Sequence, residues 1–197
     1  GRGDLLQYVD EMTNNMERFK RDAAEDSPYF DRSDGRRFGD FLMDHVPGQR
    51  VWTHSLGHTG SQLLTAYEDA PNYPRPEVRA KWLEVARGMG LFLANRQKAD
   101  GDLNDIFDEG DREVNRKPHR ISARAVVCGL WARLGRITGD KSWLERGQRL
   151  AQAVAPEIER YEYYNQMLDG VISPTAEFTD GEAAYYVLEG LVPLYEA

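Results

Sequence analysis

The sequence predicts an all-α fold, and three observations support this prediction. Apolar residues recur with the period of an α-helix over most of the chain. The alternating pattern of a strand is absent, and Val171-Ile172 is the best candidate for a very short one. The motif Gln-x-x-Asp-Gly occurs at residues 97–101 and again at residues 166–170. A turn sequence that recurs at a long interval indicates repeated supersecondary units, here pairs of helices.

Three helices are predicted in the first half of the chain. The first covers about residues 4–24, and a polar link rich in Gly and Asp follows it over residues 25–54. The second helix runs over about residues 55–69. Pro76 suits the first turn of the third helix, which ends near Arg96. The two later helices of this half are therefore joined by a short, proline-rich turn.

The fourth helix follows a second polar link, residues 97–118, and carries its apolar stripe over residues 123–137. Gly139 can end this helix in the left-handed conformation, which glycine adopts without steric cost. Asp140 can then cap the start of the fifth helix, because its carboxylate accepts hydrogen bonds from unpaired backbone N–H groups. These residues predict a very short turn between the fourth and fifth helices.

The fifth helix runs to about Asn165, and Pro156 is expected to kink it. A third link leads to Thr179, and the last helix carries apolar residues from Ala184 to Tyr195. The third link is the shortest of the three long ones.

The predicted helices fall into two alternating classes. The first, third and fifth have one apolar face and one strongly charged face, which suits an outer layer. The second, fourth and last are richer in small residues, which suits an inner layer that is contacted on several sides. These small residues are Gly57, Gly60, Cys128, Gly129 and Gly190. Links from inner to outer helices are short and links from outer to inner helices are long, so the long links should lie together above the starts of the inner helices.

Composition excludes several classes of protein. The net charge of −8, from 33 acidic and 25 basic residues, argues against a nucleic-acid partner, because phosphate contacts require a basic surface. No apolar run is long enough for a membrane span. A single cysteine, Cys128, excludes an internal disulfide and a multi-cysteine metal site. Its place on an apolar stripe predicts a buried, inert thiol. The compartment is not indicated.

Several segments resemble the (α/α)6 toroid, the six-hairpin fold of many glycoside hydrolases and polysaccharide lyases. Residues 134–140, Leu-Gly-Arg-Ile-Thr-Gly-Asp, are similar to the turn between inner and outer helices in that superfamily. Residues 95–101 and 165–170 resemble its outer-helix exits, and residues 180–184 resemble the start of a further inner helix. The resemblance covers most of residues 55–197. It implies that residues 1–197 form a single α/α-toroid domain or a fragment of one, about half of a complete ring.

The resemblance implies a carbohydrate-active enzyme, most directly a glycoside hydrolase acting on an oligo- or polysaccharide. Two alternatives remain open: a polysaccharide lyase on the same fold, and a non-catalytic helical scaffold or glycan-binding segment. Sugar epimerases share related toroids. The expected partners are a carbohydrate and either the remainder of the toroid or a second copy of the chain, because half a toroid exposes inner-helix surface. No cofactor is expected.

Acidic residues on the long links are the candidate catalytic groups. Glycoside hydrolysis uses two carboxyl groups, about 5–5.5 Å apart for retention of configuration and about 6.5–9.5 Å apart for inversion. The second link supplies Asp102 and Asp105, and the start of the last helix supplies Asp180 and Glu182. Glu182 also completes a capping box with Thr179, so capping is the competing interpretation for it. The competing interpretation for the second link is a solvated acidic loop.

Aromatic and basic residues near the same links are the candidate substrate-binding groups. Trp52, His54 and His58 could form a wall for a sugar, since aromatic faces stack on the apolar faces of pyranoses. His54 and His58 also have a spacing compatible with zinc, but no third ligand is evident, so no metal site is predicted. His119 and Arg120 could recognise a carboxylate such as that of a uronic acid. For each group, an ordinary structural or solvated role is the alternative.

Overall fold

The structure, a computed structural model, describes residues 7, 9–11, 51–104, 106–107, 121–159 and 186–197. Residues 7 and 9–11 are helical, within the first predicted helix. The elements that follow are β1 (Val51–Trp52), α2 (Thr53–Asp69), α3 (Pro76–Ala94), β2 (Ile106–Phe107), α4 (Ile121–Thr138), α5 (Lys141–Glu159), the π-helix η2 (Tyr186–Leu191) and α7 (Val192–Glu196). The all-α prediction is confirmed for the described residues. The two-residue strands β1 and β2 are an addition that the sequence did not indicate.

The helix boundaries agree closely with the pattern of apolar residues. Helix α2 begins at Thr53 rather than at Ser55, so its first turn includes His54. Pro76 is the first residue of α3, as predicted, and the N–H of Asn95 closes its last turn on Leu91 O at 2.9 Å. The strand candidate at residues 171–172 lies outside the described residues.

The turn between α4 and α5 is formed by the two residues that the sequence singled out. Gly139 has a φ of 74°, and its N–H donates to Gly135 O at 2.9 Å. The Oδ1 atom of Asp140 accepts the N–H of Ser142 at 2.9 Å, which caps the start of α5. This hydrogen bond lowers the pKa of the Asp140 carboxyl, because it stabilises the charged form. Both capping predictions are confirmed.

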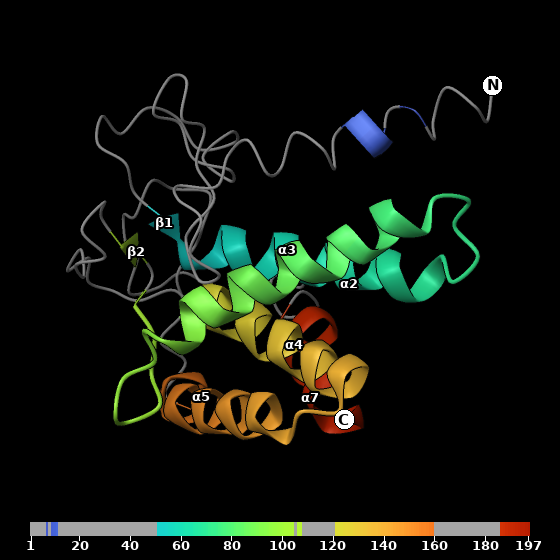
Figure 1. Ribbon diagram of the computed structural model, residues 1–197. Coiled ribbons are helices and arrows are strands. Elements are labelled where there is room, and N and C mark those ends of the chain that lie inside the picture. The colour runs from blue at the N-terminus through green and yellow to red at the C-terminus, as the bar shows by residue number, and fades with distance from the viewer. Residues whose placement is uncertain (1–6, 8, 12–50, 105, 108–120, 160–185) are drawn as a thin grey trace.

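Helices α2 and α4 run in the same direction, and α3 and α5 run in the opposite one (Figure 1). The starts of α2 and α4 lie on the left of the view, on the same side as β1 and β2. The two short turns, residues 70–75 and residues 139–140, lie at the other end of the helices. We call the end where α2 and α4 begin the long-link side.

Helix α4 lies at the centre of the described part of the molecule and packs against α2, α5 and η2. Small residues make this possible. A Cβ at Gly57 would come within 2.8 Å of Val126 Cγ2, and one at Gly129 would overlap the backbone carbonyl oxygen of Glu189. The indole N–H of Trp131 donates to Gly90 O at 3.1 Å and ties α4 to α3. The glycines assigned to an inner layer thus lie where α2, α4 and η2 touch.

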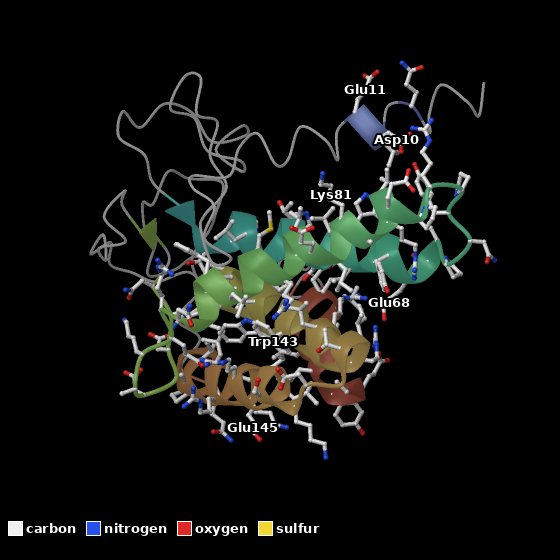
Figure 2. All side chains as sticks on the ribbon, viewed as in Figure 1. Asp10, Glu11, Glu68, Lys81, Trp143 and Glu145 are labelled. Carbon is white, nitrogen blue, oxygen red and sulfur yellow. The ribbon has the colours of Figure 1, made fainter. Side chains whose placement is uncertain are left out.

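Helix α5 shows the two-faced character expected of an outer helix. Trp143 is buried, whereas Glu145 is exposed on the opposite side of the helix (Figure 2). Helix α2 is joined to α4 near its end by Glu68, whose Oε1 accepts a hydrogen bond from Arg136 Nη2 at 2.7 Å. At the same end, Asp10 accepts the hydroxyl of Tyr73 at 3.1 Å and pairs with Arg75. Through these two contacts of Asp10, the described part of the first helix packs against the turn between α2 and α3.

Candidate functional site

The first and second long links meet at the start of α2. Strand β1, which ends the first link, pairs antiparallel with β2 of the second link, with Val51 opposite Phe107 and Trp52 opposite Ile106. Because β1 leads directly into α2, this pairing holds the second link beside the first turn of that helix. Two segments that are far apart in the sequence thus come together on the long-link side, as the alternation of loop lengths predicted.

The beginning of the second link, residues 97–104, is held to α5 by Gln97. Its Nε2 donates to Gly101 O at 2.9 Å and to Arg146 O at 3.0 Å. Arg149 Nη2 in turn donates to Gln97 Oε1 at 2.9 Å. Gly101 has a φ of 93° and packs closely against the backbone of Arg149. This geometry explains the Gln and the Gly of the first Gln-x-x-Asp-Gly motif. We call residues 97–104 the link base.

A buried ion pair holds the link base to α4. The side chain of Arg124 is fully buried, and its Nη1 lies 3.0 Å from Asp102 Oδ1. Lys98 Nζ lies 3.9 Å from the other carboxylate oxygen of Asp102. Sequence reasoning proposed Asp102 for catalysis but did not single out Arg124 as a functional residue. The available signal was an arginine within the apolar stripe of the fourth helix, which requires a partner when it is buried.

The link base also contacts α2. The hydroxyl of Thr53 donates to Asn104 O at 2.5 Å, and both residues are buried together with Leu103. The side-chain Oδ1 of Asn104 is buried and has no hydrogen-bond partner among the described residues. The link base therefore contacts α5, α4 and α2 within eight consecutive positions. The contacts with three helices hold this segment in one position.

His54 and His58 lie one helical turn apart at the start of α2. Both side chains are half-buried, and their ring centroids are 6.0 Å apart with an interplanar angle of 13°. Trp52 lies in β1, immediately before α2. The structure thus brings these three sequence-predicted residues to the region where the two links pair.

The remaining candidate residues lie outside the described residues. These are Asp105, His119, Arg120, Asp180 and Glu182. The separation of the proposed catalytic carboxyl groups is therefore untested, and their roles stay predictions. The second copy of the Gln-x-x-Asp-Gly motif, residues 166–170, also lies outside the described part of the chain.

Cys128 has the inert environment that its position predicted. It is buried in α4, and its Sγ donates to Gly147 O at 3.6 Å. Burial raises the pKa of the thiol to about 12, partly offset by the nearby positive charge of Arg124. The nucleophilic thiolate therefore does not form near neutral pH.

The described residues contain no group of three or more His, Cys, Asp or Glu side chains that could hold a metal ion. No helix among them is both long and apolar enough to cross a membrane.

Comparison with protein-family models finds no match to this chain, and comparison with curated proteins finds none either.

Proposed function

We propose that the chain is a carbohydrate-active protein of the glycoside hydrolase type, built from helical hairpins arranged as in part of an (α/α)6 toroid. The observation that carries this proposal is the meeting of two long links at the start of α2, with the short turns at the opposite end. In such an arrangement the inner helices present their starts, and the links above them, to a substrate. The parallel course of α2 and α4 supports it.

The chemistry of the proposal is acid–base hydrolysis. One carboxyl group protonates the glycosidic oxygen, and a second activates water or attacks the sugar directly. Asp105 directly follows the link base, which is held in place through Gln97, Asp102 and Thr53. We assign the partner carboxyl group to Asp180 or Glu182. Because Asp102 already neutralises the buried guanidinium of Arg124, we assign it to holding the link rather than to proton transfer.

The substrate would lie against the β1 side of the links. His54 and His58 supply ring faces and N–H groups near the start of α2, and Trp52 belongs to β1, which pairs with β2. Ring faces contact the apolar C–H surfaces of a sugar, and polar edges accept or donate hydrogen bonds to its hydroxyl groups. His119 and Arg120 are proposed to contribute if the sugar carries a carboxylate.

The test is turnover of a panel of oligo- and polysaccharides by the full chain and by Asp105→Asn, Asp180→Asn and Glu182→Gln. Loss of a general acid or base should lower kcat by about 10²–10⁴-fold. Circular dichroism and thermal unfolding establish that each variant is folded. Glu145→Gln is the matched control, since Glu145 is an exposed carboxylate on the outward side of α5.

Each outcome decides between the alternatives. Reducing sugar without a new chromophore supports hydrolysis. Products that absorb in the near ultraviolet contain a new double bond. They would show that the reaction is elimination, as in a lyase, rather than hydrolysis. Glycan binding without turnover would indicate a glycan-binding segment rather than an enzyme. The absence of both binding and turnover across the panel would refute the proposal.

A further inference from the structure

Helix α2 is uncharged over most of its length, although part of it is exposed. It contains no Asp, Glu, Lys or Arg before Glu68, one residue from its end. Its exposed and half-buried polar side chains before that point include His54, His58, Thr59, Gln62 and Thr65. By contrast, α3 carries five charged residues. The side of a helix that faces water normally carries charged residues, so the uncharged polar side of α2 suits contact with an uncharged polar ligand.

Three of these side chains form one row along the helix. His54, His58 and Gln62 are four residues apart, so each lies one turn from the next on the same side. The two imidazole rings are stacked, with centroids 6.0 Å apart, and further interactions of both residues hold them in place. At a rise of 1.5 Å per residue, the row extends about 12 Å along α2. It begins on the long-link side and is longer than one monosaccharide.

Glu189 of η2 lies at the other end of this row. Gln62 Nε2 donates to Glu189 Oε2 at 3.4 Å, so the row reaches from the start of α2 to η2. Gln62 is exposed and Glu189 is half-buried. Their contact is longer than the usual distance of about 2.7–3.2 Å for an N–H···O hydrogen bond. Both groups can therefore exchange this contact for a hydroxyl group of a ligand at little cost.

We infer that His54, His58, Gln62 and Glu189 bind an uncharged oligosaccharide of more than one sugar unit, an inference that rests on the carbohydrate-active function proposed above. Sugar hydroxyl groups donate and accept hydrogen bonds, and imidazole and amide groups do both. The carboxylate of Glu189 accepts a hydrogen bond from a hydroxyl group but repels a carboxylated or sulfated sugar. The net charge of −8 adds to this repulsion. The row therefore selects neutral sugars rather than uronic acids.

The test measures binding of oligosaccharides to the full chain by calorimetry. The probes are glucose, xylose and mannose oligomers of two and of six units, and a galacturonate hexamer as the anionic probe. We expect a neutral hexamer to bind more tightly than its dimer, because only the longer chain covers the row, and the galacturonate hexamer to bind least. Gln62→Ala and His58→Ala should each weaken binding of the neutral hexamer by about 3–10-fold, the loss expected for one hydrogen bond.

Matched variants control for composition and charge. Gln148→Ala removes an exposed glutamine of α5 and should bind like the parent chain. Glu189→Gln keeps the size of the side chain but removes its charge, so it should narrow the difference in affinity between the neutral and galacturonate hexamers. Glu145→Gln, on the exposed side of α5, should leave that difference unchanged. Circular dichroism establishes that each variant is folded.

The outcomes separate this row from the hydrolase itself. Binding of a neutral hexamer that depends on Gln62 and His58, without turnover, would support the row and refute the hydrolase. Turnover with unchanged binding in both variants, or a preference of the parent chain for galacturonate, would overturn the inference and leave the hydrolase standing. Binding of no oligosaccharide would overturn it as well. A change in self-association of Gln62→Ala, without a change in sugar binding, would identify a second copy of the chain as the occupant instead.

Discussion

At the scale of single residues, the buried guanidinium of Arg124 is the group with the most demanding environment. It is fully buried and has Asp102 as its carboxylate partner at 3.0 Å. Removing one member of a buried pair leaves an uncompensated charge, whereas replacing both by apolar groups is often tolerated. Asp102 therefore contributes to stability whether or not it contacts a substrate.

We predict that Asp102→Ala lowers the free energy of unfolding by about 3–5 kcal/mol, because it removes the carboxylate that lies 3.0 Å from the buried guanidinium of Arg124. Urea denaturation measures this loss. Asp102→Ala combined with Arg124→Met should lose less than Asp102→Ala alone. Lys98→Ala is the control for the longer contact at 3.9 Å and should change stability by less than about 1 kcal/mol. Equal losses of unfolding free energy in Asp102→Ala, in the double variant and in Lys98→Ala would contradict the role of Asp102 as the counter-charge of Arg124.

Cys128 provides a second prediction at this scale. Burial raises the pKa of its thiol from 9.0 to about 12, so between these values the unfolded thiol ionises while the folded one stays protonated. Stability is therefore unaffected by this group below pH 9.0 and falls as pH rises toward 12, by up to about 1.4 kcal/mol per pH unit. Denaturant unfolding across this range should show a shallower decline in Cys128→Ala. Rapid reaction of the native protein with a thiol reagent near neutral pH would show that the thiol is not buried.

At the scale of elements, the contact between α4 and η2 is set by two glycines. A Cβ at Gly129 would overlap Glu189 O, and a Cβ at Gly190 would overlap Ala125 O. Both obstacles are backbone atoms, which cannot move aside as a side chain can. The π-helical turn of η2 lies at this contact, where its backbone passes directly over α4.

Gly129→Ala and Gly190→Ala should each destabilise the protein by about 3 kcal/mol or more, because the two backbones must separate. Gly60→Ala is the matched control in α2. Its Cβ would lie 2.8 Å from Leu130 Cδ1, the flexible end of a side chain. The gain in helix propensity should offset that contact to within about 1 kcal/mol. Thermal unfolding compares the three variants, and a Gly129→Ala protein as stable as Gly60→Ala would disprove the close contact.

At the scale of the whole molecule, the described helices leave apolar surface exposed at the C-terminal helical segment. Leu188 is 63% exposed and Tyr195 is 92% exposed. Exposed apolar residues that lie on one segment favour association. The proposed partial toroid would expose inner-helix surface of the same kind.

We expect the protein to self-associate with rising concentration, and we expect Leu188→Ser/Tyr195→Ser to reduce this association. Sedimentation velocity over a range of concentrations measures both effects. Leu83→Ser, a half-buried leucine of α3, controls for a general loss of apolar area. A parent chain that stays monomeric at all concentrations would contradict the prediction.

Among the described residues, the sequence by itself determined helices α2 to α5, their order and the capping residues between α4 and α5. Apolar periodicity depends on near neighbours in the chain, so α2 to α5 could be located, and Pro76, Gly139 and Asp140 act within one turn of their own positions. The sequence also indicated which helices pack closely, because their glycines leave room for a neighbouring helix. These glycines are Gly57, Gly60, Gly129 and Gly190.

Only the tertiary structure decided what the link residues do. Gln97 contacts α5, Asp102 pairs with Arg124 of α4, and β1 pairs with β2, each across a long stretch of intervening chain. Such contacts follow from how the helices pack, which no local pattern specifies. In the sequence, nothing distinguished Asp102 from the other acidic residues of the second link. Folding buries Arg124 of α4, and Asp102 becomes its partner because a guanidinium removed from water requires a counter-charge.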